Sequence, residues 1–257
     1  MKLIQSRDNP FFKSLKRLAE SGRERRKTGL TLLDGVHLLE AYEAVHGPVE
    51  TLVVAESAQH GGEIAAHVAG RDVVVLADAL MRDLGLVDTP SGLLAVAAIP
   101  SGPTLADSGV DAVLLDGVQD PGNVGTLLRT AAAAGVKQVL LSPGCAAAWS
   151  PKVLRAGQGA HFVLSIHEEV DLAAFITSYR GVTAVTCLEQ STSLYEACWD
   201  GPLAWVFGAE GQGVRRELID LAGLRIRIPM PGAVESLNVA AAAAVCLFEA
   251  LRRKLAS

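Results

Sequence analysis

Three glycine-rich segments in the second half of the chain carry the polar side chains best suited to chemistry. They are DGVQDPGNVG (116–125), GAEGQG (208–213) and PMPGAVESLN (229–238). Glycine lets the main chain approach a ligand closely and adopt positive φ. The polar residues within the segments can offer donors and acceptors to the same ligand: Asn123, Glu210, Ser236 and Asn238. The three segments together predict one composite binding site.

None of these segments matches a standard nucleotide or hydrolase motif. The chain has no GxxxxGK[ST] loop, and Gly211-x-Gly213 is followed by Arg216 where GxGxxG requires a third glycine. No GxSxG elbow is present, so a serine hydrolase is unsupported. Each segment alone is compatible with an ordinary glycine-rich turn, but three of them in one domain favour a ligand site.

The elements that must position these segments alternate in the manner of a parallel sheet. Most of the predicted strands are continuous apolar runs, as expected when helices cover both faces of the sheet. Ligands of such sheets bind outside the carboxyl ends of the strands, and the three segments follow predicted strands. The predicted strands are 112–115, 138–141, 162–166, 182–186, 203–207 and 224–228, and the predicted helices are 124–134, 172–179, 214–221 and 237–254.

The first part of the chain predicts a smaller α/β unit with its own core. We therefore expect an N-terminal domain at 1–98, a linker rich in Pro, Gly and Ser at 99–110, and a second domain at 111–257. In the first domain the predicted helices are 10–20, 36–45, 63–68 and 79–84, and the predicted strands are 30–33, 51–55, 73–76 and 93–98.

The composition excludes several classes of protein. Half of the 257 residues are hydrophobic and 20% are charged, which argues against disorder and against a coiled coil. The N-terminus lacks the apolar stretch of a secretory signal, and the longest apolar run (237–248) is too short to cross a bilayer. The four cysteines have no zinc spacing. We expect a cytoplasmic protein with no metal and no membrane contact.

The positive charge is concentrated at the N-terminus, although the whole chain has a net charge of −5. Residues 1–30 hold nine Lys or Arg against three acids, a net charge of +6 that leaves −11 for the remainder. Such asymmetry predicts a basic arm that contacts nucleic-acid phosphates, with a solvated helix face as the alternative. The candidate RNA-binding residues are Arg7, Lys13, Lys16, Arg17, Arg23, Arg25 and Arg26.

Three longer stretches resemble the motifs of a known family, the SpoU (TrmH-type) RNA 2′-O-methyltransferases of the SPOUT class. LLDGVQDPGNVGTLLRTAAAAGV resembles the first motif, WVFGAEGQGV the second, and IRIPMPGAVESLNVAAAAAVCLFEAL the third, in the family's order and spacing. Residues 5–40 resemble its N-terminal substrate-binding domain, which is similar in fold to the ribosomal protein L30e. One departure is Asp34-Gly35, where a Glu-Gly pair is more usual.

The resemblance implies an α/β protein whose C-terminal domain is tied in a deep trefoil knot that binds S-adenosylmethionine. It also implies a homodimer formed through the methyltransferase domain, with active sites that combine residues of both subunits. The substrate would be RNA. Relatives with this two-domain layout resemble modifiers of large-subunit ribosomal RNA, whereas single-domain relatives more often act on transfer RNA, so ribosomal RNA is favoured.

By position in the motifs, the resemblance also assigns roles to residues. Main-chain groups at Gly208, Ile228 and Leu237, with Thr186 and Met230 as additions, would hold the cofactor. Arg129 stands where the family has an arginine proposed to help deprotonate the ribose hydroxyl. Because a guanidinium keeps its proton in proteins, Arg129 is better suited to anchoring a phosphate and stabilising a developing alkoxide. The other catalytic candidates are Asn123, Glu210, Ser236 and Asn238.

Two functions of different classes stay open at this point. One is the methyltransferase, in which Asn123 and Arg129 face the RNA and the other two segments hold the cofactor. The other is a non-catalytic RNA-binding factor of ribosome assembly that keeps the fold. Because Asn123, Arg129 and Asn238 are all present, the sequence favours catalysis.

Overall fold

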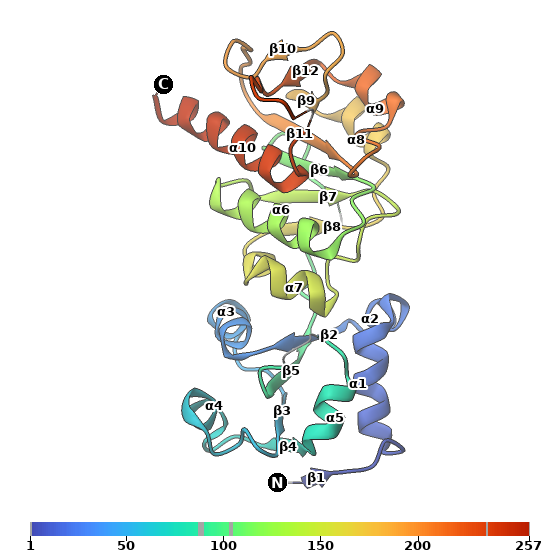
Figure 1. Cartoon of the computed structure of the whole chain (residues 1–257), viewed down its shortest axis with the longest axis vertical. Coiled ribbons are helices and arrows are strands. Elements are labelled where there is room, and N and C mark those ends of the chain that lie inside the picture. The colour runs from blue at the N-terminus through green and yellow to red at the C-terminus, as the bar shows by residue number, and fades with distance from the viewer. Residues whose placement is uncertain (1, 87–89, 103–104, 235, 257) are drawn as a thin grey trace. The chain divides into compact units, whose positions relative to one another are not determined.

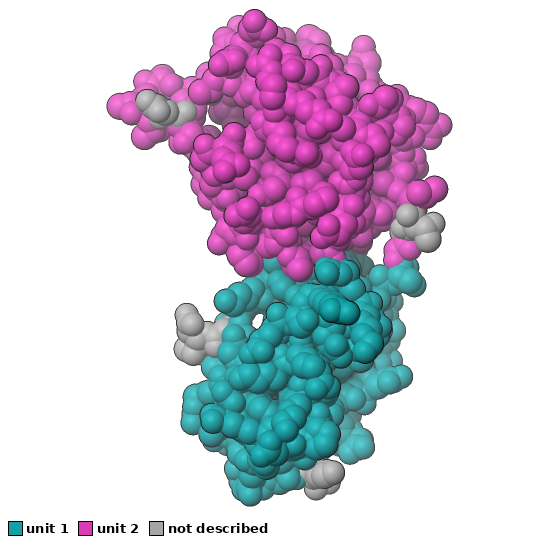
Figure 2. All heavy atoms as spheres, turned by 90° about the vertical axis from the view of Figure 1, so that its right-hand side faces the viewer, with its two compact units in different colours: residues 1–101, 149–162 teal, residues 102–148, 163–257 magenta. Residues whose placement is uncertain are grey.

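The computed structural model describes residues 2–86, 90–102, 105–234 and 236–256. The chain forms two compact units, which Figure 2 shows in separate colours. Unit 1 contains residues 1–101 and 149–162, and unit 2 contains residues 102–148 and 163–257. The division differs from the predicted domains in two respects. The segment 149–162 comes from the middle of the predicted second domain and packs within unit 1, and the predicted linker 99–110 is divided between the two units.

Unit 1 is built on a five-stranded mixed sheet in the order β1-β4-β3-β5-β2. The pairs β1–β4 and β4–β3 are parallel, and the pairs β3–β5 and β5–β2 are antiparallel. Its strands are β1 (Lys2–Ile4), β2 (Leu30–Asp34), β3 (Thr51–Ala55), β4 (Val73–Leu76) and β5 (Leu93–Ala98). Its N-terminal helices are α1 (Pro10–Glu20), α2 (Gly22–Thr28), α3 (Val36–His46), α4 (Gly62–Val68) and α5 (Asp78–Asp83).

Helix α1 is part of the core of unit 1. Asn9 caps the helix, since its side chain accepts the main-chain N–H of Phe11 at 2.9 Å. The apolar side chains of Phe12, Leu15 and Leu18 recur at helical spacing and are buried in a cluster with strand residues of the sheet. Removal of this helix would therefore open the core of the unit.

The segment 149–162 holds α7 (Pro151–Gly157) and a 3₁₀ turn, η1 (Ala160–Phe162), neither of which the sequence predicted. Thr31 donates its hydroxyl to the carbonyl of Trp149 at 2.7 Å. The buried carboxylate of Asp34 accepts hydrogen bonds from Arg155 at 2.6 Å and from the Ser91 hydroxyl at 2.7 Å. Asp34, the departure from the family motif, thus fastens this segment within unit 1.

Unit 2 contains a seven-stranded sheet in the order β10-β12-β9-β11-β6-β7-β8. Every strand pairing in it is parallel, which confirms the predicted parallel sheet. The strands are β6 (Ala112–Asp116), β7 (Gln138–Leu141), β8 (Ser165–His167), β9 (Val182–Thr186), β10 (Thr192–Ser193), β11 (Leu203–Gly208) and β12 (Leu224–Arg227). The short edge strand β10 was not predicted.

Helices cover both faces of this sheet, as Figure 1 shows. Helices α6 (Pro121–Ala133) and α10 (Val239–Ala256) pack together on one face. Helices α8 (Leu172–Ser178) and α9 (Arg216–Leu221) pack on the other, where Phe175 and Leu218 join a core cluster with strand residues such as Val206. Among the described residues, no helix is long and apolar enough to cross a membrane.

Helix α6 begins three residues earlier than predicted. Pro121 occupies its first turn, where a missing N–H is no loss. The carboxylate of Asp120 accepts the main-chain N–H of Asn123 at 2.8 Å and so caps the helix. Asn123 therefore sits in the first turn of a helix and not in a loop, which fixes the direction of its side chain.

Candidate functional site

A cavity of about 990 Å³ opens at the carboxyl ends of β9, β11 and β12. Its volume lies at the upper end of the range of about 300–1,000 Å³ that is typical of small-molecule sites. All five residues predicted to hold a cofactor line it: Thr186, Gly208, Ile228, Met230 and Leu237. Three of the polar candidates line it as well: Glu210, Ser236 and Asn238.

One wall of this cavity is the loop 209–215, which folds back tightly on the end of β11. The N–H of Gly213 donates to the carbonyl of Ala209 at 2.8 Å. A Cβ atom at Gly208 would lie 2.1 Å from the carbonyl carbon of Gly213, so only glycine fits there. Gly211 and Gly213 have φ of 79° and 70°, the left-handed region that favours glycine. The glycines of GAEGQG are thus required by the turn itself.

Three polar candidates from different segments are joined by hydrogen bonds beside the cavity. The carboxamide of Asn123 donates to Glu210 Oε1, and the carboxamide of Asn238 donates to Asn123 Oδ1 at 3.1 Å. Asn238 Oδ1 also accepts the main-chain N–H of Ala240 at 2.9 Å, which caps α10. Asn123, Glu210 and Asn238 form the polar cluster of the site, and each orients the next.

Arg129 does not join the polar cluster. It lies six residues after Asn123 on α6, about 240° further round the helix at roughly 100° per residue, so the two side chains point in different directions. Its side chain is exposed and makes no hydrogen bond or ion pair with any described residue. Ser236 is exposed at the cavity. Within one chain, the structure brings together four of the five catalytic candidates.

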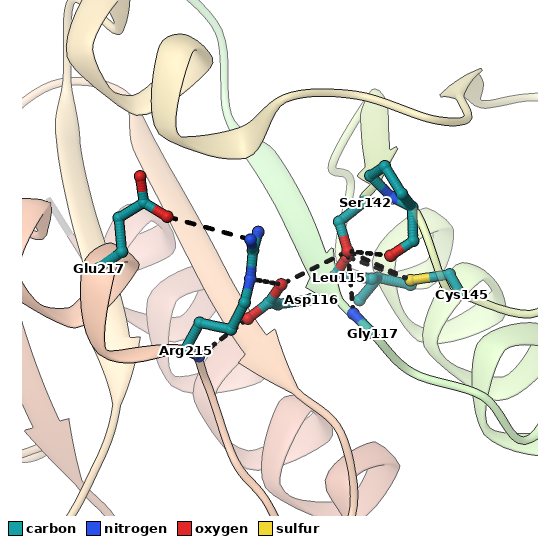
Figure 3. Close-up of polar contacts among 8 residues, drawn as sticks. Leu115, Asp116, Gly117, Ser142, Cys145, Arg215 and Glu217 are labelled. Atoms are coloured by element: carbon teal, nitrogen blue, oxygen red, sulfur yellow. Dashed lines mark hydrogen bonds and ion pairs between the residues drawn. The ribbon is translucent and has the colours of Figure 1, made fainter.

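An ion pair between the buried Asp116 and the exposed Arg215, which the sequence did not predict, fixes the loop 209–215 to β6. Asp116, 3% exposed, accepts the main-chain N–H of Arg215 at 2.9 Å and its Nε at 2.8 Å. Figure 3 shows Arg215 reaching Asp116 from one side and Ser142 from the other. Ser142 in turn accepts the N–H of Gly117 at 3.0 Å. No local pattern marks this pair, because its two residues come from distant segments.

Two cysteines near the site are poorly suited to act as nucleophiles. Cys187 lines the large cavity, and burial raises the pKa of its thiol. Cys145 donates to the carbonyl of Leu115, and burial raises the pKa of its thiol as well. Because the thiolate is the reactive form, both groups stay protonated near neutral pH. The chemistry of the cavity therefore rests on its oxygen and nitrogen groups.

The predicted RNA-binding residues all lie in unit 1, in different environments. Arg7 and Lys16 pair with Asp83, Lys13 pairs with Asp8, and Arg17 lies 3.9 Å from Glu24. These four line a hollow of about 470 Å³. Arg23 and Arg26 are exposed on α2 and pair with no described residue.

Arg25 differs from the other six residues of this set. It is 5% exposed and donates to the carbonyl of Leu18 at 2.6 Å and to that of Ala19 at 3.2 Å. Its guanidinium thus satisfies carbonyls at the end of α1. Buried in this way, Arg25 cannot reach a phosphate, and we leave it out of the RNA surface.

Comparison with known proteins agrees with this architecture. Residues 112–248 match the model of the SpoU rRNA Methylase family, and residues 9–95 match the MRM3-like substrate binding domain. The 23S rRNA (guanosine(2553)-2′-O)-methyltransferase RlmP of Bacillus subtilis is 32% identical over 251 residues, which cover 96% of this chain and 98% of that protein. The 23S rRNA (guanosine-2′-O-)-methyltransferase RlmB of Ralstonia nicotianae is 37% identical over 73% of each chain.

Solved structures lead to the same class. A crystal structure of an RNA 2′-O ribose methyltransferase has a TM-score of 0.84 at 29% identity, covering 98% of this chain and 99% of that one. An AdoMet-bound rRNA methyltransferase from Sinorhizobium meliloti has a TM-score of 0.81 at 28% identity, covering 100% and 99%. The fold and the cavity thus define an S-adenosylmethionine-dependent RNA 2′-O-methyltransferase. The chain belongs to the SpoU rRNA methylase family.

Proposed function

We propose that this protein transfers the methyl group of S-adenosylmethionine to the 2′-hydroxyl of a nucleotide in 23S ribosomal RNA. The observation that carries the proposal is the polar cluster of Asn123, Glu210 and Asn238 at the edge of a cavity lined by all five predicted cofactor residues. Relatives that match nearly the whole chain or most of it are named as 23S rRNA methyltransferases, which supports the choice of RNA.

The large cavity suits the cofactor in both shape and chemistry. Its apolar residues, including Ile228, Met230 and Leu237, offer main-chain groups and an apolar surface to the adenosyl part of the cofactor. Its wall carries both signs of charge, with Glu189 and Glu210 beside Arg215, Arg216, Arg225 and Arg227, so it offers partners to the positive groups and to the carboxylate of the cofactor. When bound, S-adenosylmethionine supplies an activated methyl group on a sulfonium.

The residues of this chain then have to align and activate the acceptor. Methyl transfer is an in-line displacement, so positioning of the ribose contributes much of the rate. The polar cluster offers both a carboxylate and carboxamides to the ribose hydroxyls, and Glu210 borders the cofactor cavity directly. Transfer of the methyl group to the 2′-oxygen leaves S-adenosylhomocysteine and releases the hydroxyl proton to solvent. As that proton leaves, the 2′-oxygen becomes negative, and a fixed cation stabilises the charge. Arg129 is our candidate for this cation.

Arg129 would reach the site from a second copy of the chain. Its side chain points away from the polar cluster of its own chain and has no partner among the described residues. Helix α10 packs beside α6 and exposes Ala241, Phe248 and Leu255, which recur every seven residues along one stripe. This unpartnered apolar stripe supports a homodimer formed through α10.

We also propose that unit 2 is knotted and that the segments following β11 and β12 form the knot.

The RNA surface of unit 1 is centred on α2. Arg23, Arg26 and Lys27 are exposed at positions i, i+3 and i+4 and pair with no described residue, so they are available to phosphates. Arg7, Lys13, Lys16 and Arg17 extend this surface, although their acidic neighbours weaken its positive charge.

Since its proposed substrate is ribosomal RNA, we propose that the protein acts in the cytoplasm.

The experiment that tests this function compares 2′-O-methyl sites in total RNA from strains with and without the gene. We expect one site in 23S rRNA to be lost, to return with the wild-type gene, and to stay absent with Arg129→Ala. If the lost 2′-O-methyl site lies in a transfer RNA, the substrate is transfer RNA and not 23S rRNA. No lost site, together with no saturable binding of S-adenosylmethionine in calorimetry, would reject catalysis.

A further inference from the structure

A second, smaller cavity lies against the loop 209–215. The same loop bounds the large cavity of about 990 Å³, which we call the cofactor cavity. The small cavity has a volume of about 270 Å³ and lies at the carboxyl ends of β6 and β7. The loop 209–215 contributes to both cavities, so it forms a shared wall between them. The opposite side of the small cavity is formed by Asp116, Gly117, Gln119, Pro143 and Gly144.

The ion pair of Asp116 and Arg215 holds the walls of the small cavity together, and Glu210 adds a further carboxylate to its lining. Arg215 is the cation among the described lining residues, and it is committed to Asp116 at 2.8 Å. The main-chain N–H of Gly117 donates to the Ser142 hydroxyl, which holds Gly117 in place (Figure 3). A cavity whose cation is already paired is a poor site for a phosphate, and it favours a neutral polar group.

Two carboxamides in the wall of the small cavity have no hydrogen-bond partner in the part of the chain that the structure describes. Gln119 and Gln212 are exposed, and neither makes a hydrogen bond with any described residue. A carboxamide presents a donor and an acceptor side by side. That pattern matches the edge of a nucleobase, and proteins read single-stranded RNA by hydrogen bonds to such edges after the base is unstacked.

We propose that the small cavity binds the base of the nucleotide to be methylated, and that Gln119 and Gln212 hydrogen-bond to the edge of that base. The inference rests on the proposed function. The small cavity, at about 270 Å³, is smaller than the range of about 300–1,000 Å³ for drug-sized ligands, which suits one nucleobase. Glu210 borders both cavities and is bonded to Asn123. The ribose then lies at the polar cluster, with its base on one side and the methyl donor on the other.

Gln119 is the sharper of the two residues to test, because it lines the small cavity alone whereas Gln212 lines both. The experiment uses the full-length protein and a 23S rRNA transcript whose methylated nucleotide has first been mapped. That nucleotide is then replaced by each of the other three. We expect wild type to discriminate among the four transcripts in kcat/KM, and Gln119→Ala to reduce that discrimination by about tenfold, the value of one pair of hydrogen bonds to a base.

Two further measurements separate base recognition from damage to the fold. The affinity of Gln119→Ala for S-adenosylmethionine, measured by calorimetry, is expected to match that of wild type. Gln59→Ala is the matched control, since it removes a carboxamide in unit 1 that lines neither cavity. If Gln119→Ala and Gln212→Ala both keep the wild-type discrimination, the inference is wrong although the enzyme methylates RNA. If wild type methylates no 23S transcript, the proposed function fails and the inference fails with it.

Discussion

The carboxylate of Asp116 holds both the main-chain N–H and the side chain of Arg215, although the two residues lie 99 positions apart in the chain. Asp116 ends β6 directly beside Gly208, the last residue of β11. The pair therefore closes the loop 209–215 at its far end, while the close approach of Gly208 to Gly213 closes it at its near end. The loop is held at both ends before any ligand binds.

This double attachment predicts that Arg215→Ala weakens cofactor binding. Loss of the side chain loosens the shared wall, and we expect the affinity for S-adenosylmethionine in calorimetry to fall about tenfold because preorganisation is reduced. The free energy of unfolding should fall by about 1–3 kcal/mol, since the buried carboxylate loses a partner. Arg180→Ala, an exposed arginine of the same unit that lines neither cavity, is the control. An Arg215→Ala variant with wild-type affinity would refute the role of the ion pair.

Replacement of Arg129 tests the assignment of the catalytic cation. Arg129→Ala should lower kcat by about 100-fold or more, the usual cost of removing a group that stabilises developing negative charge. The affinity for S-adenosylmethionine should stay unchanged, because Arg129 does not line the cofactor cavity. Steady-state transfer to 23S rRNA and calorimetry measure the two quantities separately. Full activity of the variant would show that the cation comes from elsewhere.

Asn238 has two tasks that different substitutions can separate. Its Oδ1 caps α10, and its Nδ2 donates to Asn123. Asn238→Asp keeps the capping oxygen but loses the donor, so stability should stay within about 0.5 kcal/mol of wild type while methyl transfer falls. Asn238→Ala should lose both, with about 1 kcal/mol of stability. Thermal unfolding and transfer rates check the two effects, and an active Asp variant would remove the polar cluster from the mechanism.

The structural features that could be predicted from the sequence depend on local patterns. Apolar runs such as Ala112–Leu115 are continuous because both faces of their strands are buried, so the parallel sheet and the strand-end loops followed from them. The resemblance of the motifs then grouped residues that line one cavity. What could not be predicted depends on tertiary contacts. The pairing of Asp34 with Arg155, which keeps α7 in unit 1, joins residues with no shared local signal.

The same limit applies to the basic N-terminus. Charge alone placed Arg25 with its neighbours, whereas packing turns its side chain inward toward the carbonyls of α1. The core role of α1 also means that deletion of residues 1–30 would unfold unit 1 instead of only removing charge. Substitution of exposed charges is the better experiment.

The double variant Arg23→Gln, Arg26→Gln tests the RNA surface of α2. We expect weaker RNA binding and a shallower dependence of log K on log salt, by about 0.7 for each phosphate that the protein no longer neutralises. Binding titrations at several salt concentrations measure this slope. The control is Lys137→Gln, Arg180→Gln, which removes the same charge from exposed positions of unit 2. Equal slopes for the two double variants would mean that only net charge matters.

Glu249 predicts a pH dependence of stability. Hydrogen bonds from Arg252 and Arg253 lower the pKa of Glu249 from 4.5 to about 2. A folded-state pKa below the unfolded one adds stability that is present above pH 4.5 and is lost as pH falls toward 2. Glu249→Gln should thus cost about 1 kcal/mol at pH 7, and the difference from wild type should shrink across that window. A difference that is constant from pH 7 to pH 3 would contradict the assignment.

The central claim is that the chain methylates ribose and not a base. Its most direct test is to incubate the protein with methyl-labelled S-adenosylmethionine and unmodified 23S rRNA, digest the RNA to nucleosides and identify the labelled one. We expect the label in a single 2′-O-methylnucleoside, and we expect Arg129→Ala to lower the rate of labelling by about 100-fold or more. Label in a base-methylated nucleoside, or no transfer by a wild-type protein that binds S-adenosylmethionine, would contradict it.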